Sequence, residues 1–177
     1  MKAFANNFLN FPGSSQTVDY SVVAERMTVL QLKSVSDSKH HFHKKSMLSF
    51  LKDYRNHVFF NEFSLAIIQV TSFEADLLTF LVEPNQRKNG VGKKLLELVI
   101  LYLKDLKVEK LFLEVAINNE VAIKIYSQMG FKSCGTRKNY YLSEIGTQSD
   151  ASVMVFHLSR KNGKLDKKKL QKLYPTG

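Results

Sequence analysis

The sequence predicts an α/β fold with a mixed central β-sheet, and three observations support this prediction. Two β-rich runs, SLAIIQV and DLLTFLV, are separated by the turn-prone segment TSFEA and predict an antiparallel pair of strands. A helical pattern follows this pair, and a second one follows the next strand, LFLEVA. Two further β-like runs, TRKNYYL and SVMVFHL, complete the order β-β-α-β-α-β-β, in which helices that cross between strands produce parallel neighbours.

The two helices are predicted from the spacing of their apolar residues. The first begins near RKNGVG, and its broad apolar face is formed by Val91, Leu95, Val99, Tyr102 and Leu106. Asn118 and Asn119 precede the second helix and are suited to cap its N-terminus, and Gly130 is suited to end it. The apolar stripe of this second helix is predicted to consist of Ala122, Ile125, Tyr126 and Met129.

The chain is predicted to form one folded unit with two different ends. Residues 1–20 are interpreted as an irregular N-terminal leader, and residues 21–159 as a single domain with helix-compatible stretches in 21–55. Residues 160–177 form a basic tail, since residues 160–172 carry seven Lys or Arg against one Asp. Such a tail is usually a solvated chain end, and the functional alternative is a weak electrostatic contact with RNA, the ribosome or an acidic partner.

Composition limits the class of protein. The chain has no apolar run of the roughly 20 residues that a membrane-spanning helix needs, and its start lacks the pattern of a signal peptide. We therefore expect a cytoplasmic protein without a membrane partner. Cys134, the only cysteine, excludes an intramolecular disulfide and is expected to be a small half-buried residue. Two lysines follow the cluster His40, His41 and His43 and repel cations, so we expect no metal site.

The junction between the strand that ends at Val82 and the following helix carries the main chemical signal. Gly90 and Gly92 let the backbone approach a ligand at a helix N-terminus, where unpaired N–H groups and the helix dipole favour an anion. Cationic side chains surround this point: Arg87, Lys88, Lys93 and Lys94. A pyrophosphate fits this combination, whereas a Walker loop or a dinucleotide fingerprint needs glycines that are absent here. Two glycines alone are equally compatible with a tight turn before a basic surface helix.

Three sequence blocks resemble the GNAT acetyltransferase superfamily. RKNGVG matches its Q/R-x-x-G-x-G/A motif, and LEVAINNEVAIKIYSQMGF resembles its L-E-V-x-x-x-N-x-x-A-x-x-L-Y-x-x-x-G-F block. RKNYYLSEIGTQSDASVM resembles the ending of the bacterial ribosomal-protein alanine N-acetyltransferases, the RimI type. The resemblance covers roughly residues 59–158. It implies a GNAT-like mixed sheet flanked by helices and splayed between two parallel strands, the one before RKNGVG and LFLEV, with CoA between them.

The resemblance also implies which residues bind acetyl-CoA. Phe80, Leu81 and Val82 would present backbone groups to the pantetheine arm and the thioester, and Asn119 would contact the arm. The residues implied to hold the pyrophosphate are Arg87, Lys88, Asn89, Gly90, Val91, Gly92 and Lys93.

Two residues are implied as the catalytic pair. Glu114 would be the general base, acting directly or through water, and Tyr126 would be the general acid that protonates the departing CoA thiolate. The residue pattern agrees in part, because strand alternation places Glu114 on the same face as Phe112 and Ala116. The structural alternatives are an ion pair for Glu114 and a core position with a satisfied hydroxyl for Tyr126.

The function that the resemblance implies is transfer of an acetyl group from acetyl-CoA to the N-terminal amine, in particular of alanine, of a ribosomal protein. The amine would attack the thioester directly, and because it must first lose a proton a general base is needed. Two alternatives stay open: an acetyltransferase for lysine or small amines, and a non-catalytic module that binds CoA or the ribosome. The loop 142–152 is expected to help form the acceptor groove that distinguishes among acceptors.

Overall fold

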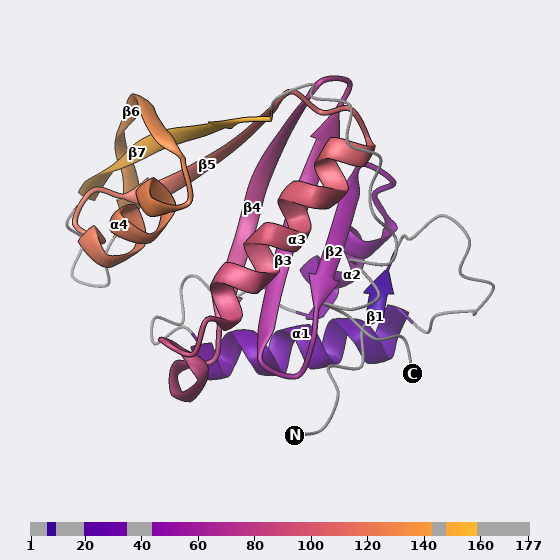
Figure 1. The fold of residues 1–177 in the computed structure, drawn as a ribbon. Helices are drawn as coiled ribbons and strands as arrows, with labels where there is room; N and C mark the ends of the chain where they lie inside the picture. The colour runs from indigo at the N-terminus through magenta and orange to yellow at the C-terminus, as the bar shows by residue number, and fades with distance from the viewer. Residues whose placement is uncertain (1–6, 10–19, 35–43, 143–147, 159–177) are drawn as a thin grey trace.

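The computed structural model describes residues 7–9, 20–34, 44–142 and 148–158. Its centre is a seven-stranded mixed sheet in the order β1-β2-β3-β4-β5-β7-β6 (Figure 1). The strands are β1 (Asn7–Leu9), β2 (Asn56–Phe60), β3 (Ser64–Thr71), β4 (Glu74–Val82), β5 (Lys110–Ala116), β6 (Lys132–Leu142) and β7 (Gln148–His157). β4 and β5 are parallel, and the other neighbouring pairs are antiparallel. The predicted α/β fold with a mixed sheet is confirmed.

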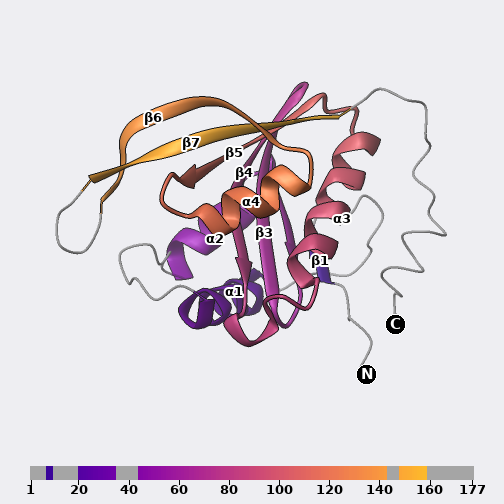
Figure 2. The ribbon, with the colours of Figure 1, turned by 60° about the vertical axis from the view of Figure 1, so that its left-hand side comes forward.

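Helices cover both faces of this sheet (Figure 2). One core joins the sheet to α3 (Val91–Asp105) and to the inner side of α4 (Glu120–Gln128). A second core joins the opposite face of β2 and β3 to α1 (Tyr20–Ser34) and α2 (Lys44–Lys52). A short 3-10 helix, η2 (Pro84–Gln86), connects β4 to α3. Because every β-strand alternates its side chains between faces, the two cores take alternate residues of the same strands.

The two predicted helices form close to their predicted bounds. Of the predicted apolar face of α3, Val91, Leu95, Val99 and Tyr102 are buried, while Leu106 lies one residue beyond the helix and is exposed. Before α4, Oδ1 of Asn119 accepts a hydrogen bond from the Ala122 N–H at 3.1 Å, and Gly130 follows the helix with φ 99°. The stripe of α4 differs by one position, because Ile123 packs on the core and Ile125 is exposed.

The N-terminal third shows two differences from the sequence prediction. Residues 7–9, inside the predicted irregular leader, form β1 and pair with β2, a strand that the sequence reading also missed. The helix-compatible stretches within 21–55 do form α1 and α2. The basic tail 160–177 and the cluster His40, His41 and His43 lie outside the described residues.

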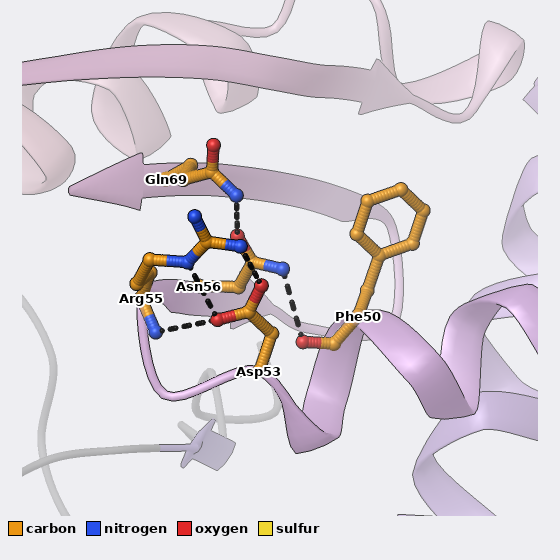
Figure 3. Close-up of polar contacts among 5 residues, drawn as sticks. All are labelled: Phe50, Asp53, Arg55, Asn56 and Gln69. Atoms are coloured by element: carbon orange, nitrogen blue, oxygen red, sulfur yellow. Dashed lines mark hydrogen bonds and ion pairs between the residues drawn. The ribbon is translucent and has the colours of Figure 1, made fainter. Parts of the chain in front are cut away.

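Polar contacts fix the turn between α2 and β2 (Figure 3). Asp53 accepts hydrogen bonds from the backbone N–H and the guanidinium of Arg55, and these bonds hold the pKa of Asp53 at about 2. Asn56 is buried; its amide donates to the Phe50 carbonyl near the end of α2 at 3.2 Å and accepts from Gln69 of β3 at 3.1 Å. The helix end is thereby satisfied and tied to two strands.

The feature that positions the site is the separation of β4 from β5. The two strands pair only over Glu74–Leu77 and Lys110–Leu113, and Figure 1 shows β5, β7 and β6 diverging from β4 beyond this point. A β-bulge lies at the same place, since Ile68 pairs with Leu77 and Ile67 with Thr79, which leaves Leu78 without a partner in β3. The predicted splay between these two parallel strands is confirmed.

Candidate active site

The loop between β4 and α3 has the backbone geometry of an anion site. Lys88 and Gly90 have left-handed backbone angles, φ 63° and 76°, and Gly90 is the N-cap of α3. The first helical hydrogen bond runs from the Lys94 N–H to the Gly90 carbonyl, and the N–H groups of residues 88–93 donate to no group within the described residues. Free N–H groups in such a turn, at the positive end of a helix, favour an anion.

The two glycines of this loop have different roles. A Cβ on Gly90 would meet nothing within 4 Å, so the backbone there faces open space. A Cβ on Gly92 would lie 3.3 Å from Cγ2 of Val82 and 3.5 Å from the Phe80 ring, so α3 rests directly on the end of β4. Arg87 reinforces this contact, because its Nε donates to the Val82 carbonyl at 3.1 Å.

The end of β4 directs alternate backbone groups toward the separation from β5. The Glu83 N–H donates to the Phe63 carbonyl of the chain before β3 at 2.8 Å, and Leu81 lies two residues earlier, opposite Leu65. By the alternation of an antiparallel ladder, Leu81 therefore bonds to β3, whereas Phe80 and Val82 point their N–H and carbonyl groups away from β3. The side chain of Leu81 packs on the α1–α2 core.

Tyr126 lies on the α3 side of the sheet, across from the end of β4. Its ring centroid is 6.3 Å from that of Phe80 and 5.7 Å from that of Phe131. Burial, with a smaller effect from Tyr141, raises the pKa of Tyr126 to about 12. Within the described residues the Tyr126 hydroxyl makes no hydrogen bond. The structural alternative, a core position with a satisfied hydroxyl, is therefore met by the packing of the ring but not by the hydroxyl.

Glu114 lies on the opposite face of β5. Leu111, Leu113 and Val115 are buried in the core that also contacts Tyr126, so the alternating residue Glu114 points to the other face, as the strand pattern predicts. Its carboxylate is mostly covered, with 22% of the side chain exposed, and its Oε1 lies 2.8 Å from Nε of Arg137. The ion pair considered as the structural alternative is therefore present.

Four further residues surround Glu114, and the sequence reading assigned none of them a role. A hydrogen bond to Glu114 raises the pKa of Tyr140, and the Tyr141 hydroxyl donates to the Glu114 carbonyl at 3.3 Å. Arg137 also lies over the Tyr140 ring, 5.5 Å from its centroid. Asp76 of β4 shares this face, and burial, aided by the charge of Glu114, raises its pKa. Three of these residues, Arg137, Tyr140 and Tyr141, lie in the block RKNYYL, which could have pointed to them. No sequence pattern singles out Asp76.

Other predicted features are placed as follows. Oδ1 of Asn119 is engaged in capping α4, which leaves its amide nitrogen for a ligand. Cys134 is exposed on β6, not half-buried as expected, because β6 is the edge strand. Within the predicted loop 142–152, residues 148–152 belong to β7, and 143–147 lie outside the described residues. No three His, Cys, Asp or Glu side chains gather around a common point in the part of the chain that the structure describes.

The described helices include none with the length and apolar character needed to cross a membrane.

Comparison with known proteins places this arrangement in a family. The model of the Acetyltransferase (GNAT) family matches residues 46–131. Ribosomal protein bS18-alanine N-acetyltransferase of Escherichia coli K12 is 38% identical over 96 residues, which are 54% of this chain and 64% of the relative. The enzyme of the same name from Haemophilus ducreyi is 36% identical over 98 residues, 55% of this chain and 68% of the relative. The chain belongs to the GNAT acetyltransferase family.

The solved structures extend the GNAT likeness over more of the chain. The crystal structure of the E. coli ribosomal-protein-S18-alanine N-acetyltransferase superimposes with a TM-score of 0.72 and 26% identity, over 90% of this chain and 99% of that one. At the sequence level the match spans slightly less than two thirds of the E. coli relative. The GNAT family model includes the loop between β4 and α3 (the anion loop), Glu114 and Tyr126. It ends before Arg137, Tyr140 and Asp150.

Proposed function

We propose that this GNAT chain is an acetyl-CoA-dependent N-acetyltransferase that acts on the N-terminal amine of a protein. The observation that carries the proposal is the separation of β4 from β5 beyond Leu77 and Leu113, with an anion loop at its open end. Glu114 and Tyr126 lie on opposite faces of the sheet beside this separation. The relatives named as alanine N-acetyltransferases of a ribosomal protein support alanine as the favoured acceptor residue and a ribosomal protein as the partner.

The chain's residues fit acetyl-CoA in two places. The free N–H groups of residues 88–93 and the cationic side chains beside them would hold the pyrophosphate, together with Arg87. The backbone groups of Phe80 and Val82 would pair with the amides of the pantetheine arm, which takes the place of a neighbouring strand, and the Asn119 amide would contact the same arm. No metal has a role in this arrangement.

The two faces of the sheet would divide the proton transfers. On one face Glu114, directly or through water, would accept the proton of the acceptor ammonium, which frees the lone pair that attacks the thioester carbon. Backbone N–H groups at Phe80 or Val82 would donate to the carbonyl oxygen as it becomes negative, a contribution typically worth roughly 3–4 kcal/mol per donor. On the other face Tyr126 would protonate the CoA sulfur as the C–S bond breaks. The nitrogen, which carries one proton too many after its attack, would release it to solvent, and solvent would reprotonate Tyr126.

The acceptor is best tested with three peptides and acetyl-CoA, with mass spectrometry locating the acetyl group. One peptide begins with alanine, the second begins with alanine and carries an internal lysine, and the third is the second with its N-terminus already acetylated. Modification of the first two at the N-terminus, with none on the third, supports the proposal. Acetylation of the third peptide at lysine favours the lysine or small-amine alternative, and CoA binding without turnover favours a non-catalytic module.

We expect Tyr126→Phe to lower kcat by about 10²-fold, the lower end of the range for general acid–base catalysis, with little change in stability. Phenylalanine keeps the ring that contacts Phe80 and Phe131 and removes only the hydroxyl. Since the pKa of Tyr126 is about 12, its proton is retained throughout the working pH range, so wild-type kcat should show no loss from this group below about pH 11. If Tyr126→Phe turns over acetyl-CoA at the wild-type kcat, solvent and not Tyr126 protonates the departing CoA thiolate.

A further inference from the structure

Strand β6 contains an irregularity beside the proposed base. Arg137 pairs with Ala151 and Tyr141 pairs with Ser149, so residues 138–140 of β6 lie opposite Asp150 alone. Asn139, in the middle of this bulge, has a left-handed backbone with φ 54°, which costs energy for most residues and is tolerated best by Gly and Asn. A bulge of this kind needs contacts that hold it in one conformation.

Asp150 supplies those contacts. Its Oδ1 accepts the Asn139 N–H at 2.9 Å, and its Oδ2 lies 2.8 Å from Nζ of Lys138. Both contacts lower the pKa of Asp150, the one with Lys138 more strongly. The Asp150 side chain is 19% exposed and that of Lys138 is 79% exposed, so the backbone contact is the more protected of the two. A single carboxylate thereby engages two successive residues of the bulge.

The bulge determines which residues reach Glu114. In a regular strand Tyr140 and Tyr141 would point to opposite faces, yet both act on Glu114: the Tyr141 hydroxyl donates to the Glu114 carbonyl at 3.3 Å, and the Glu114 side chain raises the pKa of Tyr140. Arg137 reaches Glu114 from β6 across the intervening strand β7, where its register partner is the small and fully buried Ala151. Arg137 precedes the 138–140 bulge, Tyr140 lies in it and Tyr141 follows it, so the contacts with Glu114 come from both ends of one bulge.

We propose that Asp150 is a positioning residue of the acceptor site, which holds the β6 bulge so that Arg137 and Tyr140 fix the orientation of the Glu114 carboxylate. This inference rests on the proposed function, in which Glu114 is the general base. The ion pair between Arg137 and Glu114 then serves to orient the carboxylate, and because the Arg137 side chain is 60% exposed the pair is expected to add little to stability. Asp150 acts through Glu114 and touches neither substrate.

The first arm of the test is structural and does not depend on activity. In a crystal structure of Asp150→Ala, we expect the 138–140 bulge to change conformation and the contacts of Arg137 and Tyr140 with Glu114 to be lost. A variant structure in which both contacts remain would overturn the inference. Asp150→Asn keeps an oxygen for the Asn139 N–H and loses only the charge, so it is expected to retain the bulge.

The second arm is a double-mutant cycle in turnover of a peptide that begins with alanine. Asp150→Ala is expected to lower kcat by about 10- to 100-fold, since small misplacements of catalytic groups cost up to this much, with KM for acetyl-CoA unchanged. In a Glu114→Gln background the same change should have little further effect, because a residue that acts through Glu114 loses its role there. An equal loss in both backgrounds would overturn the inference, as would unchanged turnover in the single variant.

The chain offers a matched control in Asp53→Ala. Like Asp150, Asp53 accepts a backbone N–H and a cationic side chain, but both belong to Arg55 and lie at the turn between α2 and β2. Its loss should leave kcat unchanged in both backgrounds, with melting temperatures reported for every variant. If Glu114→Gln alone turns over at the wild-type rate, the assignment of the base fails, whereas the crystal structure of Asp150→Ala still decides whether Asp150 holds the bulge.

Discussion

Replacing Glu114 with glutamine is expected to lower kcat by about 10²–10⁴-fold, the usual contribution of a positioned general base. The KM for acetyl-CoA should barely change, because the proposed cofactor contacts lie on β4, on the loop and first turn of α3 that follow it, and at Asn119, and not on this carboxylate. Glutamine keeps the size of the side chain and can still accept a hydrogen bond from Arg137, so folding should be preserved. The measurement is steady-state turnover of a peptide that begins with alanine, at several pH values.

A matched control for this variant is Glu74→Gln. Glu74 of β4 forms an ion pair with Lys110 of β5 at 2.9 Å, at the end where these two strands are still paired. Its removal should leave kcat unchanged. In the wild type the rate should rise with pH as the acceptor amine loses its proton, and Glu114→Gln, which removes the proposed acceptor of that proton, should alter this limb. Near-wild-type turnover by Glu114→Gln, with chemistry rate-limiting, would leave Glu114 as an ion-pair residue only.

Gly90→Asp is expected to weaken the binding of acetyl-CoA by at least about 10²-fold, because like charges brought together cost several kcal/mol. The space beside Gly90 is open, and aspartate is among the residues that tolerate its left-handed backbone, so the loop should keep its conformation. The new carboxylate would then lie among the N–H groups proposed for the pyrophosphate. Isothermal titration calorimetry with CoA measures the loss directly.

Gly90→Asn separates charge from shape in this experiment. Asparagine has nearly the same size as aspartate and tolerates the same backbone, but it carries no charge. We expect it to bind CoA within a few-fold of the wild type. Equal affinities for wild type, Gly90→Asn and Gly90→Asp would show that the pyrophosphate binds elsewhere and would remove the physical basis of the proposed function.

The sequence was informative where a signal is local. The spacing of Leu95, Val99 and Tyr102 predicts α3, and Asn119 with Gly130 predicts both ends of α4, because helix periodicity and caps act within a few residues. The short strand β1 was missed because three residues carry no usable period, and its pairing with β2 joins segments about 50 residues apart. The order of elements from β3 to β7 therefore followed from the sequence, and the N-terminal edge of the sheet did not.

The finer geometry of the site depends on features that no local pattern encodes. The bulge at Leu78 reverses the alternation of β4, so that Phe80 and Val82, and not Leu81, direct their backbone groups away from β3. The partner of Glu114 was equally hidden, since Arg137 lies on a strand that is not adjacent to β5. Glu114 and Tyr126 could be predicted from the resemblance to the GNAT superfamily. The residues that surround them could be identified only from the three-dimensional structure.

The placement of Glu114 and Tyr126 on opposite faces of the sheet has a consequence for the order of product release. If the acceptor approaches from the Glu114 side and CoA lies on the Tyr126 side, neither product has to leave before the other. In product-inhibition experiments CoA would then compete with acetyl-CoA, the acetylated peptide would compete with the unmodified peptide, and each would be noncompetitive with the opposite substrate. The proposed mechanism requires that a ternary complex of both substrates forms before the acetyl group is transferred, with no acetylated enzyme in between.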